Sequence, residues 1–419
     1  MWQKLLSNFL KVSLIGFLLS IPLAQRISDV FLILFLITVI FTKRQIPQVG
    51  RSPKGLIFLA IFVVAIGASL FYGPAHIAVF IRFLMAILAA TAIYKALSVE
   101  AVKPSFIMAI LVIAAIFQTI IGVGQFMLQS DLGLSFLGES SLSPTLAGVA
   151  KVDIDGGKFL RAYGTLPHPN VLAGFLIVGL LAAYFFWLRR ASEWKIFSSF
   201  RNLLSDLFFG SAIFIILLGI LFSFSRSAWL ITLAISIIFI FYSLFFRIRV
   251  IQSTRLLILL IAILGIFFWQ FKDYILPRAT FSLEESAIAA RFDYNRIGWD
   301  LIKNHPLGVG LGNQVFYSES AGLYQKYGLN QPWEKQPIHN FYILMAAEIS
   351  IFGAAAFLLF LARNMFSYKG GIASFMLGAL LIFGFTDHFL WDLQPGWLML
   401  WLTIGLVLGL NKASSLAQN

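Results

Sequence analysis

The chain has 419 residues, of which 60% are hydrophobic and only 12% are charged. This composition excludes an ordinary soluble globular domain and is typical of a membrane protein that crosses the bilayer many times. The net charge of +13 does not indicate a nucleic-acid partner, because multi-pass membrane proteins carry excess Lys and Arg on their cytoplasmic side. The chain has no cysteine, which excludes disulfides and thiol chemistry.

Apolar runs long enough to cross a bilayer predict an all-α fold with about twelve transmembrane helices. The predicted spans are residues 6–24, 29–42, 55–72, 76–95, 105–128, 168–188, 207–224, 227–246, 256–272, 341–362, 372–387 and 395–411. The resulting division is 1–271 with nine spans and a smaller outer loop near 129–167, 272–339 as a large extracytoplasmic loop, 340–411 with three spans, and 412–419 as a cytoplasmic tail.

The distribution of charge predicts the orientation in the membrane. With the N-terminus inside, the inner segments hold most of the 31 basic residues and, of the 18 acidic ones, only Glu100, Glu193 and Asp206. This asymmetry favours cytoplasmic termini and an outer 272–339 loop. Since ATP is not available on that side, an activated substrate has to arrive preassembled.

The first five spans contain one conspicuous charge, Arg82, about a third of the way into its helix. A long basic side chain at this depth can extend outward to the membrane surface, or it can face an internal cavity and bind a substrate. The sequence leaves both interpretations open.

The outer loop near 129–167 leads into the segment FLRAYGTLPHPNVLAGF. Pro169 suits the first turn of a helix, where backbone N–H groups can face an anion. Arg161, His168 and Asn170 are therefore candidate substrate-binding residues. An ordinary junction between a loop and a helix is an equally good interpretation.

Arg226 lies in the segment SFSRSAWL, at a turn between two predicted spans. A guanidinium among apolar runs needs an anionic partner, and two parallel hydrogen bonds fit it to phosphate oxygens. The alternative partner is a carboxylate of the protein, such as Asp387 or Glu348. The sequence favours a ligand.

The large loop contains one amphipathic helix. Ser282 and Glu285 have the spacing of a capping box that opens it, and Pro306 ends it. Arg291 lies at the edge of the expected apolar stripe and can reach inward. That stripe, suited to the membrane surface or to the helix bundle, consists of Ile288, Phe292, Trp299 and Ile302. The GVGLGN turn that follows lacks the spacing of a nucleotide-binding loop, so it predicts tight backbone packing.

His339 closes the large loop at the outer end of a predicted span, followed by Asn340. An imidazole at this position can act as a general base near neutral pH, or it can be a hydrogen-bonded interfacial residue. Candidate partners for a base or an arginine follow in the sequence: Glu348, Asp387, His388 and Asp392. No spacing typical of metal ligands occurs, so neither a metal nor another cofactor is predicted.

Four segments taken in order resemble the O-antigen ligase and polymerase superfamily: FLRAYGTLPHPNVLAGF, SFSRSAWL, ARFDYNRIGWDLIKNHPLGVGLGN and PIHNFYILMAAEISIFG. The resemblance covers roughly residues 140–390. It implies a GT-C-like membrane glycosyltransferase of the bacterial cytoplasmic membrane that takes a glycan from undecaprenyl diphosphate on the outer face. It also implies that Arg226 and Arg291 hold the diphosphate and that His339 activates the acceptor hydroxyl. Further candidates for substrate binding come from the sequence itself: Arg161, His168, Asn170, Arg82 and Asn340.

The expected partners are a lipid-linked glycan donor, a glycan or lipid-glycan acceptor and the lipid bilayer. Within the superfamily, a ligase, an O-antigen polymerase and a protein O-oligosaccharyltransferase remain open. A polysaccharide or lipid transporter is a more distant alternative, because the sequence shows none of the internal repeats typical of transporters. A scaffold role leaves Arg226 unexplained.

Overall fold

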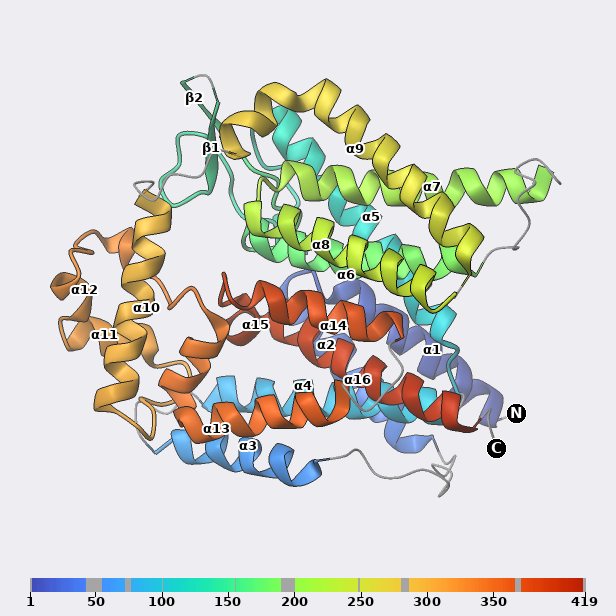
Figure 1. Ribbon diagram of the computed structural model, residues 1–419. Helices are drawn as coiled ribbons and strands as arrows, with labels where there is room; N and C mark the ends of the chain where they lie inside the picture. Colours follow the sequence, from blue (N-terminus) through green and yellow to red (C-terminus); the bar gives the residue numbers. More distant parts are fainter. Residues whose placement is uncertain are drawn as a thin grey trace. The chain divides into compact units, whose positions relative to one another are not determined.

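The computed structural model describes residues 2–42, 55–71, 77–99, 101–154, 156–189, 200–247, 249–279, 286–365 and 371–416. A helix lies on each of the twelve segments predicted to span the membrane (Figure 1). These helices are α1 (Trp2–Ser20), α2 (Gln25–Phe41), α3 (Leu56–Ser69), α4 (Ile77–Ser98), α5 (Pro104–Leu128), α6 (Pro169–Leu188), α7 (Phe200–Phe222), α8 (Arg226–Phe245), α9 (Val250–Ala279), α13 (Phe341–Met365), α14 (Ile372–Phe383) and α16 (Gln394–Leu416).

Six of the described helices are long and apolar enough to cross a membrane: α4, α5, α6, α8, α9 and α13. Five shorter apolar helical segments, of 10–17 residues, accompany them. The chain is therefore a multi-pass helical membrane protein. Twelve complete crossings remain a prediction, because several helices that lie on the predicted segments are shorter than a bilayer requires.

The sequence predicted an all-α fold, but the structure also contains a short β-hairpin. Strands β1 (Lys151–Ile154) and β2 (Gly157–Leu160) form an antiparallel hairpin in the outer loop near 129–167, with Lys151 opposite Leu160 and Ile154 opposite Gly157. Leu160 is buried with Leu142 and Tyr163 in a small hydrophobic cluster. Strands of four residues give too little alternation to be recognised in an otherwise apolar chain.

The helices form two compact units, and each unit joins segments that are distant in the sequence. The first contains Met1–Leu34 and Val102–Thr280. Within it, α6 packs against α5, α7 and α8. The helices α5 and α6 approach closely where α6 carries Gly179, since a Cβ there would lie 2.3 Å from the Cβ of Ala115. Small residues at such contacts allow close packing of membrane helices.

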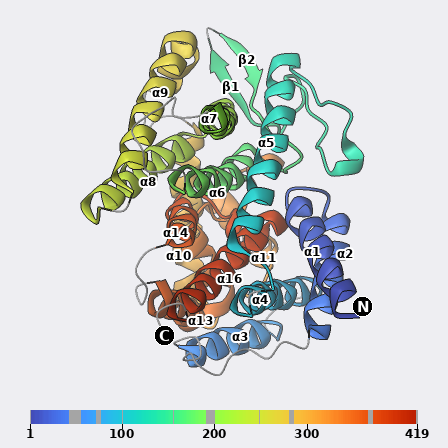
Figure 2. The same ribbon diagram turned by 90° about the vertical axis from the view of Figure 1, so that its right-hand side faces the viewer.

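The second unit contains Phe35–Ala101 and Phe281–Asn419. Figure 2 shows α3 beside α13 and α4 beside α16, in agreement with their contacts. Aromatic side chains fill its core around α15 (Phe389–Asp392), where Trp391 packs against Phe62 and Phe83. This core fixes the short α15 helix against the longer helices.

One long helix and several short helical elements make up the described part of the large loop of the second unit. They are α10 (Ser286–Asn304), α11 (Gln314–Ser320), α12 (Leu323–Lys326) and the 3₁₀ turn η2 (Pro332–Glu334). A second 3₁₀ turn, η1 (Ser135–Leu137), belongs to the first unit. The helix predicted between the capping box and Pro306 is thus present as α10, whereas Ser282 and Glu285 themselves lie outside the described residues.

The apolar stripe predicted on α10, for the membrane surface or for the helix bundle, does not lie on one side of the helix contact. Phe292 and Trp299 are 56% and 51% exposed, whereas Ile302 is buried. The face that packs on α13 carries instead the buried residues Tyr294, Ile297 and Leu301. Their spacing of three and four residues is also helical, and a sequence with two apolar faces does not show which of them meets the protein.

Candidate functional site

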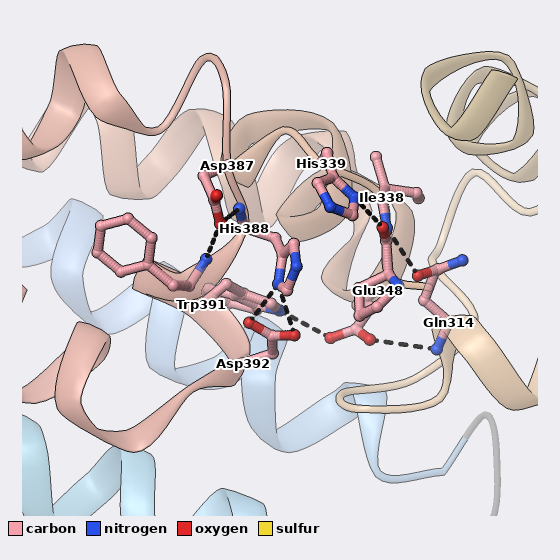
Figure 3. Close-up of polar contacts among 10 residues, drawn as sticks. Gln314, Ile338, His339, Glu348, Asp387, His388, Trp391 and Asp392 are labelled. Carbon is pink, nitrogen blue, oxygen red and sulfur yellow. Dashed lines mark hydrogen bonds and ion pairs between the residues drawn. The ribbon is translucent and has the colours of Figure 1, made fainter. Parts of the chain in front are cut away.

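His339 lies in the last turn of the large loop, two residues before α13 begins. Its Nδ1 is 2.8 Å from the carbonyl oxygen of Pro337 (Figure 3). A carbonyl oxygen can only accept a hydrogen bond, so Nδ1 carries the hydrogen and Nε2 of the neutral ring carries the lone pair. The backbone of the PIHNF segment therefore selects the tautomer in which Nε2 can take a proton.

Two other rings fix the imidazole of His339. The ring of Tyr294 stacks on it, with centroids 5.1 Å apart and planes 15° apart, and the ring of His388 meets it at 74° with centroids 4.8 Å apart. The Tyr294 hydroxyl donates a 2.7 Å hydrogen bond to the carbonyl oxygen of Glu334. Burial raises the pKa of Tyr294 to about 12, so this phenol stays protonated at neutral pH and is not itself the base.

His388 is held by carboxylates on both sides. Its Nδ1 lies 2.8 Å from both carboxylate oxygens of Asp392, one helical turn later. The carboxylate of Asp387 accepts the backbone N–H groups of His388 and Phe389 at 2.8 and 3.3 Å. Burial alone would lower the pKa of His388, but the charge of Asp392 and its hydrogen bond raise it to about 9. His388 is therefore a cation at neutral pH.

His339 has the opposite character. Burial lowers its pKa to about 4, and the positive charges of His388 and Arg291 act in the same direction, against the opposing charge of Asp387. Its ring is therefore neutral at pH 7 and can accept a proton. The charge of Arg291 lowers the pKa of both imidazoles. Arg291, His339 and His388 therefore lie close enough in the second unit for their charges to interact.

Glu348 is buried on α13 and is bonded to backbone and indole N–H groups. Its carboxylate accepts hydrogen bonds from the backbone of Gly312 at 2.8 Å and of Gln314 at 3.2 Å, and from the indole of Trp391 at 2.7 Å. The side-chain oxygen of Gln314 in turn accepts the backbone N–H of Ile338, next to His339. Glu348 thus ties α15 to the segment that carries the candidate base, rather than acting as a direct partner of that base.

The GVGLGN turn packs its backbone against α13, as the sequence predicted. The N–H groups of Val309 and Gly310 donate to the carbonyl oxygens of Ala347 and Glu348, at 2.9 and 3.0 Å. These carbonyls are available because α13 is interrupted at Ile349 and Ser350, where φ and ψ are not helical. A sheet-like pairing of turn and broken helix therefore positions the carboxylate of Glu348.

Alanine at Gly308 is expected to destabilise this arrangement strongly. Gly308 has φ +87°, and a Cβ there would lie 2.3 Å from the carbonyl oxygen of Glu348. Left-handed strain and a backbone clash together predict a loss of roughly 2 kcal/mol or more of the free energy of unfolding. Gly328→Ala is the matched control, since Gly328 has φ +76° but open space around a Cβ. Thermal unfolding in detergent that shows equal losses for both variants would contradict the packing argument.

In the first unit, the structure brings Arg161 and Asn170 together. The Arg161 side chain is buried, donates to the Asn170 side-chain oxygen at 3.0 Å and donates to the Ser223 carbonyl oxygen at 2.7 Å. His168 caps α6 by accepting the N–H of Asn170 on its Nδ1 at 3.2 Å. One of the amides proposed to face an anion is thus bonded within the protein, which favours the structural interpretation of this junction.

Arg226 is the first residue of α8 and is half-buried. Ser225 caps this helix, its hydroxyl accepting the N–H of Ala228 at 3.3 Å. The same turn carries Ser223, whose carbonyl oxygen binds Arg161. Two basic side chains therefore flank one turn in the first unit, a pairing that the sequence did not reveal because they are 65 residues apart.

The remaining two candidates lie in the second unit. Asn340 caps α13: its side-chain oxygen accepts the N–H groups of Tyr342 and Ile343 at 3.0 and 3.1 Å. This geometry gives it a structural role, and a role in substrate binding stays a prediction. Arg82 is half-buried in α4, and its neighbour Phe83 packs against Trp391 of α15. That end of α4 therefore lies beside the helix that carries Asp392.

Sequence reasoning missed one residue of this site, Tyr294. A signal was present, since Tyr294 follows Arg291 by three residues and so shares a face of the same helix. His388 and Asp392 are among the partners that the sequence offers, and their spacing of four residues predicts the contact that the structure shows.

The fold and the site together define a multi-pass helical membrane protein with a neutral imidazole, a second, cationic histidine and an arginine gathered next to its large loop. Residues 211–358 match the family model described as O-Antigen ligase, so the resemblance to the O-antigen ligase superfamily is confirmed over that region. The match includes Arg226, Arg291, His339 and Glu348. A search of curated proteins gave no significant match.

Proposed function

We propose that the protein is a metal-independent glycosyltransferase that moves a glycan from undecaprenyl diphosphate to an acceptor hydroxyl. The observation that carries this proposal is the state of His339, a neutral imidazole whose Nδ1–H is bonded to the Pro337 carbonyl. This geometry supplies a base with a defined accepting atom beside a guanidinium. The match to the O-antigen ligase family supplies the class of reaction.

The proposed reaction is a single displacement. The acceptor hydroxyl gives its proton to Nε2 of His339 while its oxygen attacks the anomeric carbon of the glycan. The bond from that carbon to the diphosphate oxygen breaks, and undecaprenyl diphosphate leaves with the electron pair. Arg291 stabilises the negative charge that grows on the diphosphate, an interaction that is stronger in the transition state than in the bound donor. This course inverts the anomeric configuration, and a product that keeps the donor's configuration would refute it.

Arg226 is proposed as a second ligand of the diphosphate. It begins α8, and Trp229, one turn later, lines an apolar cavity of about 520 Å³ between α7, α8 and α9. A basic residue one helical turn from a side chain that lines an apolar cavity suits a lipid with a diphosphate head.

The proposed location is the bacterial cytoplasmic membrane, with both termini in the cytoplasm and the large loop on the periplasmic or extracellular side. The excess of Lys and Arg in the inner segments supports this orientation. On that side, a lipid-linked donor provides both the energy and the leaving group. The acceptor separates three variants of the proposal: a lipid A core sugar for a ligase, the growing glycan for a polymerase and a protein hydroxyl for a protein transferase.

The test is glycan transfer with purified protein, an undecaprenyl diphosphate oligosaccharide and each class of acceptor, with and without EDTA. Transfer that survives EDTA and is lost in Arg226→Ala supports the proposal, and the productive acceptor distinguishes ligase from polymerase. Passage of the lipid-linked donor across liposomes without transfer to any acceptor would favour the transporter instead. Activity that requires an added divalent ion would refute the metal-independent form.

A further inference from the structure

His388 takes no part in the displacement described above, yet its ring lies against that of the proposed base. The two imidazoles are 4.8 Å apart between centroids. The side chain of His388 is only 12% exposed, and its Nδ1 is held by both oxygens of Asp392 at 2.8 Å. A buried histidine fixed in this way by a carboxylate carries a lasting positive charge.

We propose that His388, held as a cation by Asp392, is a positioning residue that keeps His339 a weak base until the anionic diphosphate of the donor lies beside it. This inference rests on the proposed function. It assigns to the pair of His388 and Asp392 a role in controlling the base, not in contacting the acceptor.

The physical argument begins with the charges around the two rings. Arg291 from α10 and His388 both disfavour a proton on His339, while Asp387, in the turn before α15, favours it. Among the groups of the protein itself, burial and the positive charges prevail, which holds the pKa of His339 at about 4. Glu348 from α13 is bonded to Gly312, Gln314 and Trp391, and Tyr294 stays protonated, so neither offsets these positive charges directly.

A bound diphosphate changes this balance. Its negative charges would lie near Arg291 and offset the positive charges that act on His339, so a proton on His339 becomes less costly. The base then becomes stronger when the donor is present and stays weak when the site is empty. Proton removal from an acceptor hydroxyl, or from water, is thereby linked to the presence of the donor.

The pH dependence of transfer tests this link. The acidic limb of the pH profile of kcat/KM reports the pKa of the base in the free enzyme, and that of kcat reports its pKa in the complex with the donor. If the donor raises the pKa of His339, the limb of kcat lies at the higher pH in the wild type. His388→Gln removes the charge and keeps a polar side chain. It is expected to raise the limb of kcat/KM by about one pH unit and to move the limb of kcat in the same direction.

Asp392→Asn is the second variant, because without its carboxylate His388 loses its proton near neutral pH. It should shift the limb of kcat/KM in the same direction. His305→Gln is the control, because the ring of His305 bonds the hydroxyl of Tyr317 at 2.7 Å instead of meeting His339. The limb of kcat/KM should stay at the wild-type pH in this variant. A uniform loss of rate at all pH values in His388→Gln, with neither limb moved, would overturn the proposal.

A readout that needs no transfer separates this inference from the proposed function. Diethyl pyrocarbonate reacts with neutral imidazole, so the rate of modification of His339, followed by mass spectrometry of its peptide, reports its protonation. We expect a rate independent of pH above about 5.5 in the wild type and a fall toward acidic pH in His388→Gln. Such a fall without any glycan transfer would sink the proposed function alone. Transfer with identical modification profiles in both proteins would sink the inference alone.

Discussion

Replacing His339 by alanine is expected to lower kcat for glycan transfer by a factor of about 10² to 10⁴. The reason is specific to its geometry: the Pro337 carbonyl holds the hydrogen on Nδ1, so Nε2 is the atom that takes the acceptor's proton. The alanine variant keeps the backbone but has no group there that can take this proton. The measurement is the initial rate of transfer from the lipid-linked donor at saturating acceptor.

The control for this prediction is His305→Ala. His305 also lies in the large loop, and its ring meets that of Tyr317 edge-on with centroids 4.7 Å apart, whereas the ring of His339 stacks on that of Tyr294. A comparable packing loss without loss of the base should leave kcat within a few-fold of the wild type. Thermal unfolding of both variants in detergent shows whether either has lost its fold. Wild-type rates in a folded His339→Ala protein would remove the base from the mechanism.

The sequence predicts the helices of this protein better than its local contacts. Apolar runs alone locate α5 and α6 to within a residue or two at each end, because a bilayer demands long uninterrupted apolar helices. The exposed face of α10 could not be predicted in the same way. Phe292 and Trp299 form as good a stripe as Tyr294 and Ile297, and only the packing of α10 on α13 decides between them.

The candidate site divides in the same manner. Arg226 and His339 can be selected from the sequence, since polar groups beside apolar runs require partners. Arg291 is selected mainly by the resemblance to the family. The function of Glu348 cannot, because it depends on the N–H groups of Gly312 and Gln314, which reach its carboxylate only after the GVGLGN turn has packed on the broken α13. The charge of Glu348 alone suggests that it pairs with an arginine, whereas in the fold its partners include backbone N–H groups.

Replacing Arg291 by alanine is the second change with a large expected effect, a fall of about 10² to 10³ in kcat/KM. Its guanidinium lies close enough to His339 and His388 for its charge to act on both. In the proposed reaction it stabilises the charge that grows on the diphosphate. Arg291→Lys keeps the charge but not the planar fork, so it should recover only part of the loss.

Arg296→Ala is the matched control on the same helix. Arg296 is five residues further along α10, its side chain is 66% exposed, and it pairs with Asp293 at 3.0 Å. An exposed pair of this kind contributes little, so transfer should stay near the wild-type rate. Equal losses in the two variants would show that α10 needs basic charge in general, as a helix at an anionic membrane surface would. A loss confined to Arg291→Ala would instead locate the diphosphate beside the imidazole of His339, which is the geometry that the displacement requires.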